Sequence, residues 1–129
     1  MARIKKGTTD WAHLLAWDGS GSGARAWFNV ATGAAGSSST FGSGRSVIDH
    51  FVSDAGDGWY DCIAIFEKAG ATAIGRISPS DGDGLTGSAV GKSIYIARSQ
   101  ISEGATPQGY KKTVDVAGHQ IPIAPGAES

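Results

Sequence analysis

The chain has one cysteine, little surplus charge and no long apolar run, and each shortage excludes a class of protein. One cysteine among 129 residues excludes an intrachain disulfide. The formal net charge is −1 and no basic stripe is present to hold a phosphate backbone, so nucleic acid is not an expected partner. No apolar run approaches the roughly 18 residues that a membrane-spanning helix needs, so no membrane partner is expected either.

A helical pattern is also missing, because no segment repeats apolar residues every three or four positions. The 20 glycines, with many serines and aspartates, divide the chain into short apolar runs separated by turns. These runs recur about every 10 to 18 residues, as strands do in a sandwich. The sequence therefore predicts an all-β fold: a two-sheet antiparallel β-sandwich of the jelly-roll type, with no substantial helix.

The expected strands cover much of the first hundred residues. They comprise residues 4–6, 11–17, 25–31, 45–52, 59–66, 71–78 and 93–101. Residues 37–44 are small and polar, and we expect them to be irregular. We expect residues 1–113 to form the domain, and residues 114–129, with few large side chains, to form a weakly ordered tail or linker.

Residues 58–67 are expected to form the central strand. Alternation places Tyr60, Cys62, Ala64 and Phe66 on one face, and Trp59, Asp61, Ile63 and Ile65 on the other. Both faces are mostly apolar, which predicts that one meets the core and the other a covering loop, a ligand or a partner subunit. Cys62 is expected to be a small buried side chain rather than a catalytic thiol.

Four stretches, in order, resemble a lectin-like (concanavalin A-like) jelly-roll domain of tailed-phage structural proteins and carbohydrate-binding modules. They are IKKG at residues 4–7, WFNVATG at 27–33, DGWYDC at 57–62, and the segment 94–113 that begins IYI. The resemblance implies a two-sheet jelly roll that binds sugar or forms part of a virion surface. It implies no enzyme and no fixed set of binding residues.

The chain also departs from that family's pattern. Asp61 stands where the family often has arginine, and Ala97-Arg98 stands where it often has Trp-Gly. Family members usually have more chain before residue 4, so we expect an edge strand to be missing or supplied by another molecule.

Side chains that alternate outward from residues 11–17 and 25–31 form the candidate ligand face. Sugar rings stack on indole rings while nearby polar side chains bond their hydroxyls, and a set of exposed tryptophans is otherwise unfavourable. We expect Asp61 to extend the same face. The candidate ligand-binding residues are Trp11, His13, Trp17, Arg25, Trp27, Asn29 and Asp61. Aromatic and arginine enrichment marks protein interfaces equally, so this face fits either a glycan or another subunit.

Alternating carboxylates occur in residues 80–84, where Asp81 and Asp83 are candidate ligands of a structural calcium ion. The loop lacks the spacing of an EF-hand, so a plain turn without any cofactor is the preferred interpretation. Catalysis is not expected, because glycoside hydrolysis needs two carboxylates that face each other across a cleft, and Glu67 lies at the end of its strand. The three histidines have no metal-ligand spacing.

We therefore expect a non-catalytic carbohydrate-binding module of phage type, not an enzyme, with a polysaccharide or cell-surface glycan as its partner. It would act in host-surface attachment or virion decoration. The alternative is a purely structural virion protein whose aromatic face is buried in a homo-oligomer, a trimer being favoured, or against other virion proteins. With no disulfide and no recognisable signal peptide, we expect synthesis in a bacterial cytoplasm and a final place on the virion surface or outside the cell.

Overall fold

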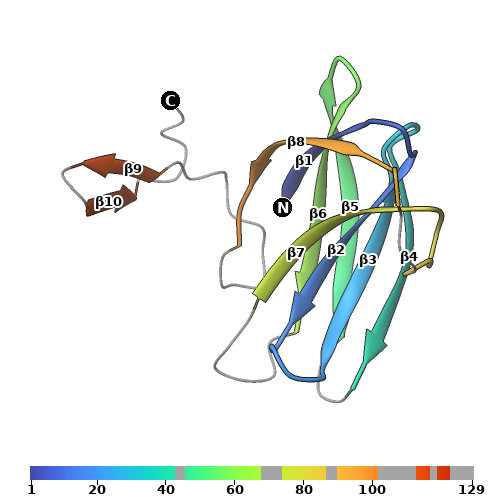
Figure 1. The fold of residues 1–129 in the computed structure, drawn as a ribbon, viewed down its shortest axis with the longest axis horizontal. Coiled ribbons are helices and arrows are strands. Elements are labelled where there is room, and N and C mark those ends of the chain that lie inside the picture. The colour runs from blue at the N-terminus through green and yellow to red at the C-terminus, as the bar shows by residue number, and fades with distance from the viewer. Residues whose placement is uncertain (43–45, 68–73, 87–89, 102–112, 117–118, 123–129) are drawn as a thin grey trace.

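The computed structural model describes residues 1–42, 46–67, 74–86, 90–101, 113–116 and 119–122 (Figure 1). Within these ranges all regular secondary structure is β-strand, and no helix that could cross a membrane is present. The strands are β1 (Ala2–Lys6), β2 (Trp11–Trp17), β3 (Gly23–Asn29), β4 (Ala34–Phe41), β5 (Val47–Gly56), β6 (Trp59–Phe66), β7 (Ile74–Ser80), β8 (Ile94–Ser99), β9 (Thr113–Val116) and β10 (His119–Pro122).

Two four-stranded antiparallel sheets, ordered β5-β6-β1-β8 and β4-β3-β2-β7, form the two layers of the molecule (Figure 1). β1 pairs with β8 and β2 pairs with β7, so early and late parts of the chain meet in both layers. The predicted all-β antiparallel sandwich is confirmed. β9 and β10 pair with each other as a separate two-stranded sheet, in a part of the chain where a weakly ordered tail was expected.

The core lies between the two sheets and uses the faces that alternation predicts. Its buried members come from four strands and the turn after β3: Ala2, Ile4, Ala12, Leu14, Ala26, Phe28, Val30 and Cys62. Tyr60, Ala64 and Phe66 of β6 pack against them, as expected. Burial, with a smaller contribution from the Asp61 charge, raises the pKa of the Cys62 thiol to about 12, so this cysteine is protonated and inert at neutral pH.

Strand β4 is the main error of the sequence prediction, which left residues 37–44 irregular. Its side chains are small, polar and mostly exposed. An edge strand needs backbone partners more than apolar side chains, and β3 supplies those partners along Gly23–Asn29. The strand pairing also contains two bulges, at which side chains do not alternate strictly. At the first, Gly36 and Ser37 of β4 both lie opposite Trp27 of β3. At the second, Ile48 of β5 has no direct partner on β6 and is 63% exposed.

Parts of several predictions lie outside the described residues. These are residues 43–45, residues 71–73 of an expected strand, residues 102–112 of the resemblance, and residues 117–118 and 123–129 of the expected tail.

Candidate functional site

The outer face of the β4-β3-β2-β7 sheet collects six of the seven predicted ligand residues. In the register of β2 with β3, Trp11 lies opposite Asn29, His13 opposite Trp27, and Leu15 opposite Arg25. Directly opposed residues of an antiparallel pair point to the same side of the sheet. Their neighbours Ala12 and Leu14 point into the core, so the outer set is Trp11, His13, Trp17, Arg25, Trp27 and Asn29.

Asp61 does not belong to this set, and the prediction that it extends the aromatic face is wrong. β6 lies in the other sheet, where Asp61 is paired with Arg3 of β1. The Arg3 guanidinium donates two hydrogen bonds to the carboxylate, of 2.7 Å to Oδ1 and 3.0 Å to Oδ2. This bidentate ion pair uses both carboxylate oxygens and explains why an aspartate follows the Trp-Tyr pair here.

Trp27 lies under the loop that follows β7 and is only 1% exposed. Its indole Nε1 donates a 3.1 Å hydrogen bond to the carbonyl oxygen of Leu85. The Ser80 hydroxyl donates a 2.8 Å hydrogen bond to the same carbonyl and so closes the loop between Ser80 and Leu85. Trp27 is therefore a structural residue with no ring face open to a sugar.

Asp83 fastens that loop to β4. Its Oδ1 accepts hydrogen bonds from the Ser37 backbone N–H (2.8 Å) and hydroxyl (2.9 Å). A Cβ built at Gly36 would lie 2.5 Å from this oxygen and 2.7 Å from the Trp11 ring, so only glycine fits there. Asp81 is exposed, and no group of three or more candidate metal ligands occurs in the described residues. The calcium site at Asp81 and Asp83 stays a prediction.

His13 is buried beside Trp27, with the two ring centroids 5.5 Å apart. Its Nδ1 has no hydrogen-bond partner in the part of the chain that the structure describes. Burial first, and then the positive charges of Arg25 and Arg76, together lower the pKa of His13 to about 4. The imidazole is therefore neutral at pH 7 and forms part of the layer beneath the outer face.

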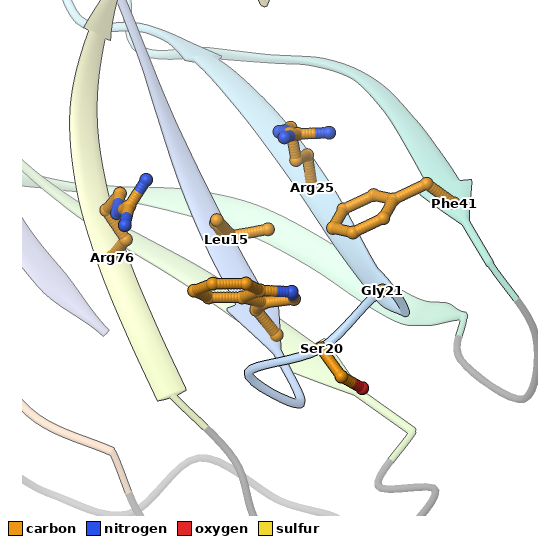
Figure 2. Close-up of a pocket in the computed structure, with 7 residues that line it drawn as sticks. Leu15, Ser20, Gly21, Arg25, Phe41 and Arg76 are labelled. Atoms are coloured by element: carbon orange, nitrogen blue, oxygen red, sulfur yellow. The ribbon is translucent and has the colours of Figure 1, made fainter.

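A hollow of about 230 Å³ opens at the end of this face away from the covering loop (Figure 2). It is lined by Leu15, Trp17, Ser20, Gly21, Arg25, Phe41 and Arg76, which come from all four strands of the sheet and the β2–β3 turn. Gly23 of β3 allows the Phe41 ring to lie beside the hollow, because a Cβ at Gly23 would lie 2.6 Å from that ring. Sequence reasoning nominated Trp17 and Arg25 but missed Phe41, since its strand was expected to be irregular.

Arg25 and Arg76 flank the hollow on either side of Leu15 (Figure 2). The Arg25 guanidinium carbon lies 4.5 Å from the centroid of the Phe41 ring, and that of Arg76 lies 5.8 Å from the Trp17 ring. Stacking of this kind holds each planar guanidinium in place over an aromatic face. Neither arginine forms an ion pair with a carboxylate of the described residues.

The turn at the mouth of the hollow is built around Asp18. Its Oδ1 accepts hydrogen bonds from the backbone N–H groups of Ser20, Gly21 and Ser22, at 2.8 to 3.1 Å. The backbone bonds from Ser20 and Ser22 are the largest causes that lower the Asp18 pKa to about 2. These three backbone N–H groups already donate to Asp18, so a ligand in the hollow would be bound by the side chains that line it.

No family model matches this chain, and no curated protein and no solved structure matches it.

Proposed function

We propose that this protein is a non-catalytic carbohydrate-binding module that holds a glycan on the outer face of the β4-β3-β2-β7 sheet. The observation that carries the proposal is the composition of the hollow: two aromatic rings, Trp17 and Phe41, beside two guanidinium groups, over a buried leucine. Sugar rings bind through this combination of a flat apolar surface and a few directional donors.

The same composition argues against hydrolysis. None of the seven lining residues is a carboxylate, whereas cleavage of a glycosidic bond ordinarily uses a facing pair of them. Binding without turnover is the activity that these side chains support. The resemblance of residues 4–113 to the lectin-like phage domain adds the biological setting, attachment to a host-surface glycan or decoration of a virion.

The test is binding to a panel of soluble polysaccharides, measured as retardation in affinity electrophoresis. Trp17→Ala is expected to abolish retardation, because it removes the ring beside Arg76. Trp59→Ala is the matched control, since Trp59 lies on the other sheet, where Lys5 stacks over it. Retention of binding in Trp17→Ala, with loss in Trp59→Ala, would move the site to the other sheet.

A structural virion protein is the second candidate, and a different surface favours it. On the outer face of the β5-β6-β1-β8 sheet, Phe51 lies opposite Ile63 and is 38% exposed, and Tyr95 is 61% exposed. Exposed large aromatic side chains on both edge strands of an open sheet are compatible with a subunit interface. A stable trimer in light scattering, combined with no binding to any polysaccharide of the panel, would favour this candidate over the first.

A further inference from the structure

Arg25 and Arg76 both line the hollow. Leu15 pairs with Arg25 on one side and with Arg76 on the other, so both arginines project from the same row of the sheet. Two strand spacings of about 4.8 Å separate their Cα atoms by about 10 Å. Two long side chains that start at this separation can both reach one group placed above Leu15.

Neither arginine forms an ion pair with a carboxylate of the described residues. The chain holds 12 acidic and 11 basic residues, yet no carboxylate lines the hollow. Asp18, in the adjoining turn, has its Oδ1 engaged by the turn's own amide groups. Two like charges in the same row of the sheet repel each other, and an anion bound between them offsets that repulsion.

The surroundings of the two guanidinium groups increase their effect on a bound anion. Leu15 beneath them is 6% exposed, and the hollow's apolar floor lowers the local dielectric constant. Because each group already stacks on an aromatic ring, less side-chain entropy is lost when a ligand binds. The same two charges add to burial in lowering the pKa of His13, which lies in the next row.

We infer that the glycan recognised in this hollow is acidic: a carboxylate or sulfate group on a sugar ring lies between Arg25 and Arg76, and the ring packs against Trp17 or Phe41. This inference rests on the proposed carbohydrate-binding function and gives it a substrate class. Arginine matches the planar geometry of a carboxylate or the oxygens of a sulfate better than it matches a hydroxyl. Because the whole chain carries a net charge of −1, a general attraction of polyanions does not account for such binding.

The test uses two pairs of probes that differ only in charge. Polygalacturonate is compared with its fully methyl-esterified form, and dextran sulfate is compared with dextran, by titration calorimetry at low salt. The wild-type protein is expected to bind at least one acidic member about tenfold or more tightly than its neutral counterpart. Which pair shows the preference distinguishes a carboxylate from a sulfate ligand.

Variants of the two arginines test whether the preference for an acidic probe depends on the hollow. Arg25→Gln and Arg76→Gln are each expected to weaken binding of the acidic probe about tenfold, and the double variant to bind it no better than the neutral probe. Lys92→Gln, which removes the same charge from an exposed position outside the hollow, is expected to change the affinity less than twofold.

The outcomes separate the two claims. If neutral and acidic members of each pair bind equally, the glycan function stands and the inference is overturned. Acidic binding that Lys92→Gln weakens as much as the arginine variants also overturns it, because the attraction is then diffuse. If no polysaccharide binds, the proposed function and the inference fail together. The wild-type comparison of charged and neutral probes decides the matter even where a variant does not fold.

Discussion

Charged side chains on the outer faces of the two sheets have different partners. On the β5-β6-β1-β8 sheet, Arg3 is paired with Asp61 through two hydrogen bonds, and Lys5 lies over the Trp59 ring at 5.9 Å. On the β4-β3-β2-β7 sheet, Arg25 and Arg76 stack on aromatic rings but have no carboxylate partner in the described residues. Arg3 therefore has a carboxylate partner on its own sheet, whereas Arg25 and Arg76, like Lys5, contact an aromatic ring.

A second difference lies within the aromatic face itself. Trp27 is covered by the loop that Asp83 and Leu85 hold in place, whereas Trp17 lines the open hollow. Tryptophans on one face of neighbouring strands thus have different environments: Trp27 is buried, and Trp17 is the one that we propose to contact a ligand. The following changes test these contrasts, beginning with the largest expected effect.

Trp27→Ala should lower the free energy of unfolding by about 3–5 kcal/mol, because it leaves a cavity under the loop and removes the hydrogen bond to Leu85. Urea denaturation followed by far-ultraviolet circular dichroism measures the loss. Trp17→Ala is the matched control and should cost about 1 kcal/mol or less, as is usual for partly exposed side chains. Equal losses in the two variants would contradict the division of roles.

Stability should fall as the pH is lowered from about 6.5 to about 4. The pKa of His13 is depressed on folding from 6.5 to about 4, by burial first and then by Arg25 and Arg76. The unfolded chain therefore binds a proton in this interval that the folded chain excludes, and the loss reaches up to about 3 kcal/mol. Thermal unfolding between pH 4 and pH 8 measures it.

His13→Leu is the control for that pH dependence. The variant loses no hydrogen bond at Nδ1, which has none in the described residues, and has no proton to bind. Its stability should be nearly constant over the same interval relative to the wild type. A wild-type slope that survives in His13→Leu would assign the effect to another group.

Asp61→Ala should cost about 1 kcal/mol in unfolding free energy and leave polysaccharide binding unchanged. The carboxylate pairs with Arg3 in a partly exposed position, with 29% and 21% of the Arg3 and Asp61 side chains exposed, where such pairs contribute little. A double-mutant cycle with Arg3→Ala isolates the coupling between the two. Loss of binding in Asp61→Ala would return this residue to the ligand site.

Asp83→Ala should lower the unfolding free energy by about 1 kcal/mol or less, from loss of the two exposed hydrogen bonds to Ser37. We expect the same difference in calcium and in a chelator. A melting temperature that calcium raises in the wild type but not in Asp83→Ala would instead establish the loop as a calcium site.

Local alternation was a good guide to what happens inside one strand. It identified the core faces of β2, β3 and β6, and it brought Trp17 and Arg25 to a common outer face. It failed for β4, whose small polar side chains carry no apolar alternation, and at the bulge that exposes Ile48. It also could not foresee that Phe41 and Arg76, on the two edge strands, would line the same hollow as Trp17.

By itself, the sequence determined the all-β class, the positions of most strands and the inward and outward faces of β2, β3 and β6. These follow from turn chemistry and a two-residue period, which are properties of neighbouring residues. Only the tertiary structure decided that Asp61 and Trp17 lie on different sheets, that a loop covers Trp27, and that Arg25 and Arg76 share a row. Those facts depend on which strands pair across long stretches of chain, and the local pattern carries no information about that pairing.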